Sequence, residues 1–424
     1  MIRKKIDVVV IGAGPAGLAA AVSAKRNGID NVMLLERNEF LGGILLQCIH
    51  DGFGLHLYDR MLAGPQYAER MTKDLEKEDV DFLLNSMVIN IDKNKVITAS
   101  NKKNLIQIEA KAIILSMGCR ERTRGAIEIP GFRPAGIFTA GVAQNYMNLK
   151  NIKPGKEVVI LGSGDVGMIM ARHVALEDGI NPVCVLELMP YIGGLTRNKA
   201  QCLDDYNIPL LLSTTVTDIK GKYRLKGITT SKVDENLKPI KETENDITCD
   251  TLFLSVGLIP ENELSKKSGV ILSTGTKGPE VDNNYETNIP GIFSAGNVLH
   301  IHDVADYASF EGYYVGEKAA EFVKSGWDYP KRFPVQVGED IMYLLPQFLR
   351  EDCRETELKF RVKKPYENIR VIIKNGDEIL YKKRFSKILA SEMQKVKVKS
   401  KKPMSDVKIY IEKTEVSVSD KMKK

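Results

Sequence analysis

The sequence contains few cysteines, and no two of them are close together. Its six cysteines are spread over 424 residues without a CxxC pair. This spacing argues against a zinc site, an iron–sulfur cluster and a redox-active dithiol. Unpaired thiols in a chain of this length are typical of a reducing compartment, so we expect a cytoplasmic protein.

Long hydrophobic runs are also missing. A bilayer span needs ~20 consecutive apolar residues, and only the stretch that ends at Ala24 comes near that length. Because Arg3, Lys4 and Lys5 precede it, this stretch resembles a secretory signal. Asp7 and the glycines from Gly12 onward interrupt it, so we expect neither a signal nor a membrane span.

Excess positive charge is confined to the C-terminal part. The formal net charge is +6, with an excess of 10 positive charges from Pro330 to the end and an excess of 4 negative charges elsewhere. A nucleic-acid-binding protein would carry basic residues along its main binding face, so this distribution argues against that class. The length predicts two or three domains.

What the sequence does contain is a glycine-rich segment after its first apolar run. Ile6–Ile11 is typical of a buried parallel strand, and Leu18–Arg26 is typical of a helix. The GxGxxG sequence between them suits a tight turn, close approach to a pyrophosphate and helix–strand packing. A second strand, Val32–Leu35, ends at Glu36, where a carboxylate can bind a ribose. The segment consists of Gly12, Ala13, Gly14, Pro15, Ala16 and Gly17.

The same pattern occurs again after residue 150. Glu157–Leu161 predicts a strand, Met168–Leu176 a helix, and Pro182–Leu186 a second strand that ends at Glu187. Two complete patterns predict two dinucleotide sites. Glu187 would repel the 2′-phosphate of NADPH by ~1–4 kcal/mol, so we expect a preference for NADH. The loop residues of this second segment are Gly162, Ser163, Gly164, Asp165, Val166 and Gly167.

Further small residues follow predicted strands. Gly42 and Gly43 come after the strand that ends at Glu36 and would let an extended cofactor pass close to the backbone, which favours FAD at this first site. The apolar runs 112–118, 251–257 and 291–297 end in glycine or Gly-Asn, and a helix is expected from about Ala308 to Lys324.

The order of these motifs resembles the pyridine nucleotide–disulfide oxidoreductase superfamily. The resemblance runs from about Ile6 to Phe322. Local sequences resemble one subgroup, the bacterial flavoproteins that accompany a flavin-dependent glycerol-3-phosphate dehydrogenase and are related to subunits of hydrogen cyanide synthase and opine oxidase. These sequences are GGILLQCIH at 42–50, DGFGLH at 51–56, RERTRG at 120–125, GGLTR at 193–197 and GNVLH at 296–300.

The resemblance implies an α/β fold with two Rossmann-like dinucleotide-binding domains, in which an NAD domain is inserted into a split FAD domain. Residues 1–119 and 259–330 would form the FAD-binding domain, and residues 120–258 the NAD-binding domain. Residues 340–424 would add a small basic β domain.

The resemblance also implies which residues bind the two cofactors. Most of the superfamily has Asp where Asn297 stands, although Asn can still form hydrogen bonds. Besides the first glycine segment, the FAD set is Glu36, Arg37, Gly42, Gly43, Val88, Met117, Gly118, Gly296 and Asn297. The NAD(H) set is Gly162, Gly164, Asp165, Val166, Gly167, Glu187 and Gly257.

These assignments predict an FAD-dependent oxidoreductase that transfers hydride between NAD(H) and flavin. The resemblance implies that electrons are exchanged with a partner, namely a glycerol-3-phosphate dehydrogenase subunit together with a small cysteine-rich protein. Two alternatives stay open: a stand-alone NADH oxidase or peroxidase that uses Cys48, and a non-catalytic dinucleotide-sensing regulator. The electron acceptor, the direction of flow and the oligomeric state also stay open.

Cys48 is the candidate catalytic side chain. A thiol after Gly42 and Gly43 could cycle through a sulfenic acid, with His50 lowering its pKa, but we favour a buried inert thiol. His300 and His302 stand two residues apart without an evident third ligand, so we expect no metal site.

The last part of the chain has the alternating pattern of half-exposed antiparallel strands. It is clearest in Leu358–Val362, Ile369–Ile373 and Val407–Ile411, and Asn375–Gly376 predicts a hairpin turn. We expect the lysines on the exposed face, where they form either a solvated basic surface or a docking surface for an acidic partner.

Overall fold

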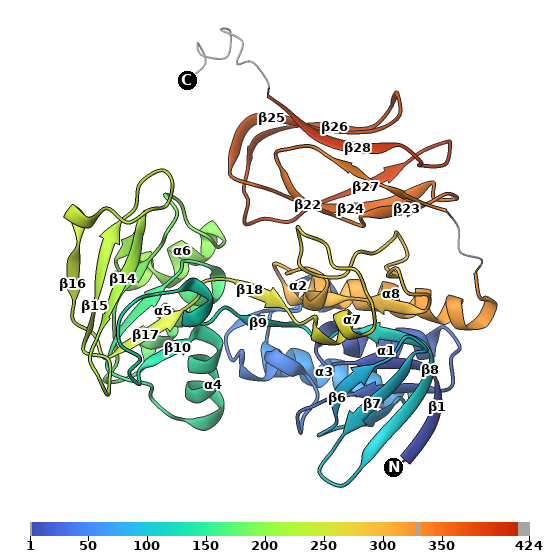
Figure 1. Cartoon of the computed structure of the whole chain (residues 1–424), viewed down its shortest axis with the longest axis horizontal. Helices are drawn as coiled ribbons and strands as arrows, with labels where there is room; N and C mark the ends of the chain where they lie inside the picture. The colour runs from blue at the N-terminus through green and yellow to red at the C-terminus, as the bar shows by residue number, and fades with distance from the viewer. Residues whose placement is uncertain (1, 328–330, 414–424) are drawn as a thin grey trace. The chain divides into compact units, whose positions relative to one another are not determined.

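The computed structural model describes residues 2–327 and 331–413, so the expected domain ends at 330 and 424 lie outside the described residues. The chain divides into two compact units (Figure 1). The first combines Met1–Cys119 with Pro260–Lys424, and the second is Arg120–Ile259. The chain passes between them at strands β9 (Cys119–Glu121) and β18 (Leu258–Pro260).

The first unit is built on a mainly parallel sheet with the strand order β5-β2-β1-β8-β7-β6, in which β19 also pairs with β8. Parallel pairing joins β1 to β2 and β8, and β19 to β8, whereas the β6-β7-β8 edge is antiparallel. The strands are β1 (Ile2–Ile11), β2 (Val32–Leu35), β5 (Asp81–Leu83), β6 (Met87–Ile91), β7 (Val96–Ser100), β8 (Leu105–Leu115) and β19 (Ile292–Ser294).

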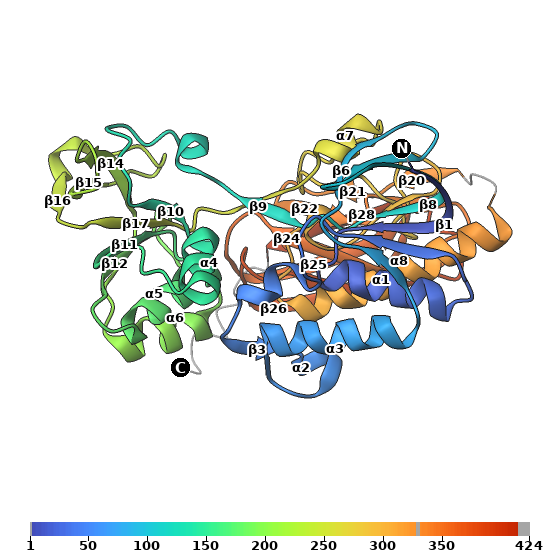
Figure 2. The same cartoon turned by 90° about the horizontal axis from the view of Figure 1, so that it is seen from below.

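Alternate residues of the central strands enter two different cores. Val8 and Val10 of β1 pack on the helices, whereas Val9 and Ile11 face residues of β6 and β7. Both faces are therefore covered, which explains the continuous apolar strands. Figure 2 shows helices α1 (Pro15–Arg26), α3 (Gly64–Lys77) and α8 (Ala305–Ser325) on one side of this sheet.

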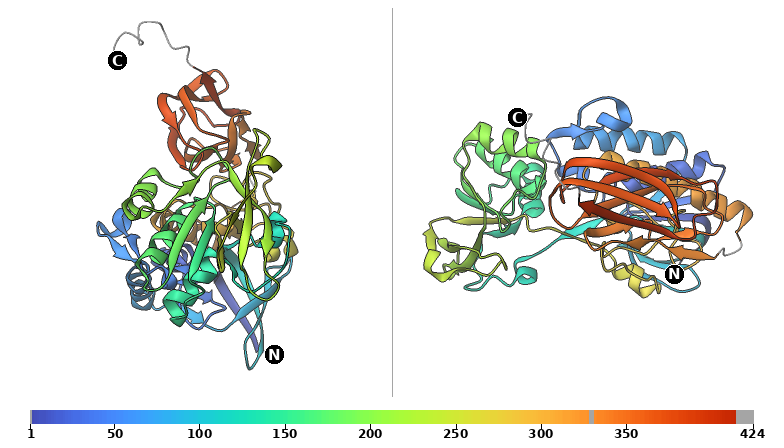
Figure 3. Two further views of the ribbon diagram at one scale, coloured as in Figure 1. Left: turned by 90° about the vertical axis from the view of Figure 1, so that its left-hand side faces the viewer. Right: turned by 90° about the horizontal axis from the view of Figure 1, so that it is seen from above.

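The second unit repeats the parallel α/β pattern on a smaller scale. Its sheet has the order β10-β17-β11-β12-β13, and a separate antiparallel sheet has the order β14-β15-β16 (Figure 3, left). The strands are β10 (Ile137–Thr139), β11 (Glu157–Leu161), β12 (Asn181–Leu186), β13 (Leu210–Leu211), β14 (Thr214–Lys220), β15 (Gly227–Lys232), β16 (Asn245–Ile247) and β17 (Thr251–Leu254). The helices are α4 (Ala140–Lys150), α5 (Asp165–Leu176) and α6 (Thr196–Cys202).

The end of the chain forms a small β domain within the first unit. Two sheets, β21-β28-β25-β26 and β22-β24-β27, enclose a core that includes Phe360, Val371 and Ile373 (Figure 3, right). Strand pairing in this domain begins at Arg332, before the expected start at Asp340. The sequence did not reveal the two short strands there, because they lack an alternating pattern. The strands are β20 (Arg332–Pro334), β21 (Gln336–Val337), β22 (Ile341–Leu345), β23 (Phe348–Arg350), β24 (Glu355–Val362), β25 (Tyr366–Asn375), β26 (Glu378–Ile388), β27 (Gln394–Lys399) and β28 (Val407–Lys413).

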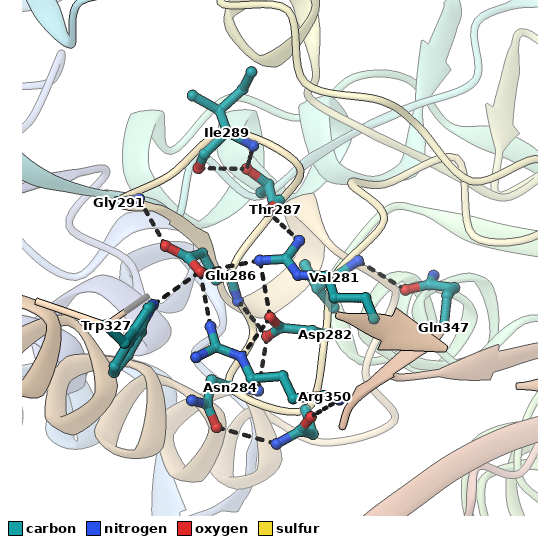
Figure 4. A network of polar contacts seen from close by, with 12 residues as sticks. Val281, Asp282, Asn284, Glu286, Thr287, Ile289, Gly291, Trp327, Gln347 and Arg350 are labelled. Carbon is teal, nitrogen blue, oxygen red and sulfur yellow. Dashed lines mark hydrogen bonds and ion pairs between the residues drawn. The ribbon is translucent and has the colours of Figure 1, made fainter. Parts of the chain in front are cut away.

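A buried ion-pair network joins this β domain to the rest of the first unit. Arg350 of β23 donates from Nε to Asp282 Oδ2 and from Nη2 to Glu286 Oε2, both at 2.7 Å (Figure 4). Arg332 reaches the same two carboxylates at 2.9 and 3.0 Å. The Arg350 guanidinium also lies 4.3 Å from the ring centre of Trp327. The expected α/β fold, with two Rossmann-like units and a C-terminal β domain, is confirmed.

Candidate functional site

The first glycine segment forms a tight turn between β1 and α1. Gly12 has a φ of +103°, and a Cβ there would lie 2.5 Å from the Ser116 carbonyl oxygen. A Cβ on Gly17 would lie 1.8 Å from the Gly12 carbonyl oxygen. Gly14 differs, because a Cβ there would have no atom within 4 Å. The first and third glycines are therefore required by the protein's own packing, whereas Gly14 borders open space.

Glu36 holds the turn from the end of β2. Its buried carboxylate accepts the Ala13 N–H at Oε2 (2.9 Å) and the Asn38 N–H at Oε1 (2.8 Å). Gly42 donates its N–H to the Ala13 carbonyl at 2.9 Å. A Cβ on Gly43 would lie 3.1 Å from the Gly14 Cα. The structure thus brings the glycine turn, Glu36 and the Gly-Gly pair together.

The segment after β19 reaches the same turn. A Cβ on Gly296 would lie 2.7 Å from the Ala16 Cβ. Asn297 follows, and its Oδ1 accepts the backbone N–H of His302 at 3.0 Å. Because a backbone N–H can only donate, this contact fixes the amide oxygen on the His302 side and leaves Nδ2 toward the Cys119 sulfur at 3.6 Å.

The other residues expected at the first site are more scattered. Pro15 opens α1, Gly118 has a φ of +75° beside open space, and Arg37 is exposed. The Val88 and Met117 side chains pack with the core on the β6 side of the sheet. Their side chains therefore do not face the glycine turn.

The second glycine segment has matching geometry in the second unit. Gly162 has a φ of +105°, and its Cβ would lie 2.1 Å from the Ser255 carbonyl oxygen. A Cβ on Gly167 would lie 2.3 Å from the Gly162 carbonyl oxygen, while the nearest atom to a Cβ on Gly164 is 3.8 Å away. Gly257, two residues after Ser255, has a φ of +99°. The two turns therefore repeat one steric pattern at all three glycines.

Glu187 is the counterpart of Glu36. It is buried, and its Oε2 accepts both the N–H and the Oγ–H of Ser163 at 2.9 and 2.6 Å. Its Oε1 accepts the Met189 N–H at 2.9 Å. In this unit Asp165 accepts the Leu195 N–H at 2.8 Å, so it fastens the start of α6 rather than standing free. Val166, beside it in α5, is exposed.

The NAD(H) set expected for this second site omits three residues that the geometry includes: Ser163, Gly193 and Gly194. A Cβ on Gly193 would lie 3.5 Å from the Gly164 nitrogen, and one on Gly194 would lie 2.6 Å from Asp165 Oδ1. The signal was present in the sequence, since this Gly-Gly pair follows Glu187 at the same spacing as Gly42 follows Glu36.

Both turns fit the pyrophosphate of a dinucleotide. The middle glycine of each lacks a close neighbour on the side where a Cβ would project. The N-termini of α1 and α5 follow these glycines directly, and their N–H groups and dipoles favour a phosphate. The loop engages only some of the lone pairs on each buried glutamate. The remaining lone pairs can accept hydrogen bonds from ribose hydroxyls.

Comparison with known proteins decides the family. A model described as "Pyridine nucleotide-disulphide oxidoreductase" matches residues 6–312. The chain belongs to this family. It is an FAD-dependent oxidoreductase of pyridine nucleotides, and its dinucleotides are FAD and NAD(P)H.

The individual relatives have low sequence identity to this chain. Hydrogen cyanide synthase subunit HcnB of Pseudomonas aeruginosa is 25% identical over 324 residues, which cover 72% of this chain and 67% of the relative. An opine oxidase subunit of Agrobacterium tumefaciens is 26% identical over 314 residues, covering 69% and 61%. The crystal structure of T. acidophilum thioredoxin reductase is similar with a TM-score of 0.61 at 25% identity, covering 75% of this chain and 98% of that one.

A buried cluster of charged side chains contacts the backbone of Gly296. Glu311 of α8 accepts the Gly296 N–H at Oε1 (2.8 Å) and the Lys359 ammonium at Oε2 (2.7 Å). His300 Nε2 lies 3.1 Å from Oε2, and His302 Nε2 lies 3.4 Å from Oε1. Burial alone would raise the pKa of Glu311, but the Lys359 charge and both histidines hold that pKa well below its usual range.

His300, His302 and Glu311 place ligand-type atoms within 4.8 Å of one another, a spacing that a metal ion could bridge. The Lys359 ammonium and the Gly296 N–H already engage the two carboxylate oxygens. A cation would have to displace a like charge at 2.7 Å, so the donor set fits an internal ion pair better than a metal.

Cys48 lies at the end of the Gly43–Gln47 turn and donates from Sγ to the Ile44 carbonyl at 3.3 Å. Burial raises the pKa of this thiol to about 12. The His50 Nδ1 lies 2.9 Å from the Asp51 carbonyl oxygen and is engaged there, not at the sulfur. This conformation therefore gives no support to a reactive thiolate, and the inert thiol stays the favoured interpretation.

A Cys48→Ser variant should keep NADH–dye reductase activity within about twofold of the parent, because a protonated thiol contributes little to hydride transfer. Steady-state rates with ferricyanide as the acceptor check this. Loss of all NADH oxidation in a folded, flavin-loaded variant would instead place the sulfur in the reaction.

Proposed function

We propose that this protein transfers hydride between NAD(H), held at the Gly162–Gly167 turn, and FAD, held at the Gly12–Gly17 turn. The observation that carries the proposal is the steric equivalence of the two turns. In each, the outer glycines are required by packing, and the middle glycine borders space for a phosphate. The wider flavin contacts on the first turn come from Gly43, Gly296 and Asn297.

When bound, FAD supplies the redox chemistry. The chain's own residues bind and orient it. The α1 N-terminus would hold the pyrophosphate, Glu36 the ribose, and the Gly296–Asn297 segment the part beyond the pyrophosphate. The N-terminus of α8, a few residues after Asn297, adds a positive dipole end that favours negative charge.

We further propose that the electrons are exchanged with a partner protein in the cytoplasm. Two relatives are named as subunits of larger enzymes. The sequence has no closely spaced cysteine pair, so it offers no CxxC dithiol to carry the electrons. The subgroup resemblance favours a glycerol-3-phosphate dehydrogenase subunit, with a small cysteine-rich protein, as this partner. Among the described residues, no helix is both long enough and apolar enough to cross a membrane.

Anaerobic titration tests the redox proposal. The purified full chain should be yellow, and one equivalent of NADH should bleach its flavin absorbance. A colourless protein, or a yellow one that NADH does not bleach, would favour the dinucleotide-sensing regulator.

Co-purification of the native complex tests the partner proposal. A larger dehydrogenase should remain bound, and isolation of the chain alone with rapid peroxide formation would favour a stand-alone oxidase.

The coenzyme preference depends on Glu187. Its carboxylate is fixed by Ser163 and Met189, so it cannot turn away from a 2′-phosphate. We expect kcat/KM for NADH to exceed that for NADPH by about fivefold or more, from a repulsion of ~1–4 kcal/mol. In a Glu187→Gln variant the amide oxygen can still accept hydrogen bonds but the charge is gone, so the preference should shrink. A parent enzyme whose kcat/KM for NADPH equals that for NADH would contradict this assignment.

A further inference from the structure

Two lysines face each other on neighbouring strands of the C-terminal β domain. On one face of the β24–β27 ladder, two rungs pair a glutamate with a lysine, but the third pairs Lys359 with Lys395. Opposite charges directly across a ladder stabilise it, and like charges destabilise it. The third rung therefore requires a compensating negative charge. The rungs are Glu355–Lys399, Glu357–Lys397 and Lys359–Lys395.

Among the described residues, only Lys359 of these two lysines forms an ion pair. Lys359 is buried and bonds Glu311 at 2.7 Å. Lys395 is half-buried, and its ammonium lies over the Tyr307 ring. Among the described residues, no carboxylate lies within ion-pair distance of Lys395. Burial and the Lys359 charge lower the pKa of Lys395 to about 8, and the carboxylates of Glu357, Glu311 and Asp303 oppose this shift.

Lys395 lines a cavity of about 430 Å³ between α8 and strands β24 and β27. The volume falls within the range of roughly 300–1,000 Å³ found for small-molecule sites. Several aromatic side chains line it, and Glu311 and Lys359 lie on its wall. The aromatic lining residues are Tyr285, Tyr307, Phe310 and Tyr314.

We propose that this cavity binds a small monocarboxylate with an aromatic or apolar body, and that its carboxylate pairs with Lys395. Lys395 is the half-buried lysine of the lining that forms no ion pair among the described residues, and one negative charge would balance it. A phosphate dianion would add excess negative charge beside Glu311 and Glu357, which also line the cavity. The aromatic side chains suit a flat apolar body, which gains from stacking and from leaving water.

The cavity is linked to the proposed flavin site through one residue. Glu311 lines the cavity and also accepts the Gly296 N–H at 2.8 Å. A ligand anion beside Lys395 would change the charge balance around Glu311, and the change would reach the Gly296–Asn297 segment. An effect of the ligand on flavin absorbance rests on the proposed function, whereas binding at Lys395 does not.

Benzoate serves as the probe, with the flavin-loaded full chain in the calorimeter. We expect benzoate to bind the parent, Lys395→Met to weaken binding at least tenfold, and Lys395→Arg to retain it. Lys383→Met, an exposed lysine of β26, is the matched control and should leave binding unchanged. Lys395→Met removes an unpaired charge, so its thermal midpoint should be no lower than that of the parent, which shows that it folds.

The outcomes separate the claims. No benzoate binding to the parent up to about 10 mM, or equal binding to Lys395→Met, overturns the site. Tighter binding of inorganic phosphate than of benzoate overturns the monocarboxylate assignment. Lys395-dependent binding with a change in flavin absorbance supports both the site and its link to Gly296. The same binding without that change supports the site and tells against its link to the Gly296–Asn297 segment.

Discussion

Replacing Gly14 with alanine should give a folded protein that has lost its flavin. Gly14 has an extended backbone, with φ of −75° and ψ of −176°, which alanine adopts without strain. The added methyl group meets no protein atom within 4 Å, so stability should be unchanged or slightly higher. It projects where the pyrophosphate would lie. We expect FAD affinity to fall by about 100-fold, or about 3 kcal/mol, as measured by flavin retention and by titration of the apoprotein.

The two turns provide matched controls. Gly17→Ala places its Cβ 1.8 Å from the Gly12 carbonyl oxygen, so it should lower both thermal stability and flavin content. Gly164→Ala is the same change in the second turn, where the backbone is also extended. It should leave the protein yellow and raise the Kd for NADH. A Gly14→Ala protein that retains FAD at parental affinity would contradict the assignment of the first turn to the flavin.

Arg350→Leu should destabilise the protein by about 3–5 kcal/mol, because it leaves a buried ion-pair network short of one cation. Asp282 and Glu286 are fully buried, and Arg350 bonds both. Burial raises the pKa of Glu286, and Arg350 is among the groups that oppose this rise. Without Arg350, Arg332 alone would face two carboxylates. Urea unfolding followed by Trp327 fluorescence checks the expected loss.

Arg370→Leu is the control for this change. Arg370 lies in the same β domain, but its side chain is 40% exposed and the Glu412 carboxylate that it faces is 3.7 Å away. Exposed pairs of this kind contribute about 0–1 kcal/mol. An equal loss of stability in both variants would show that the buried network has no special role.

The glycine motifs predicted more of the fold than any other feature. Gly12 and Gly162 each need a left-handed backbone against a neighbouring strand, and a GxGxxG sequence between an apolar strand and a helix meets this need locally. The roles of the acidic residues Glu36 and Glu187 were predicted from their distance along the chain from the first glycine of each segment. Such features lie within a few tens of residues, so the local sequence contains them. Gly193 and Gly194 were missed only because the Glu-to-Gly-Gly spacing of the first site was not carried over to the second.

The basic β domain shows where local reasoning failed. Strict alternation predicted exposed lysines on β24, yet Lys359 is 6% exposed and bonds Glu311 of α8. Arg361, on the same strand, is likewise paired, with Asp303. Alternation separates the two faces of a strand, but it does not say whether the polar face meets water or another element. A charged residue tolerates such burial when a partner of opposite charge lies beside it.

The sequence by itself determined two glycine turns, the glutamates that follow them and the alternating strands of the last domain. Each depends on contacts within one βαβ unit or one hairpin, where spacing and residue type suffice. Only the tertiary structure decided that Glu311, Lys359 and Lys395 line one cavity and that Glu311 also accepts the Gly296 N–H. It also decided that Asp282 and Glu286 form ion pairs with the same two arginines. Charges from distant segments combine according to packing, because a buried ion is stable only beside a partner that no local pattern specifies.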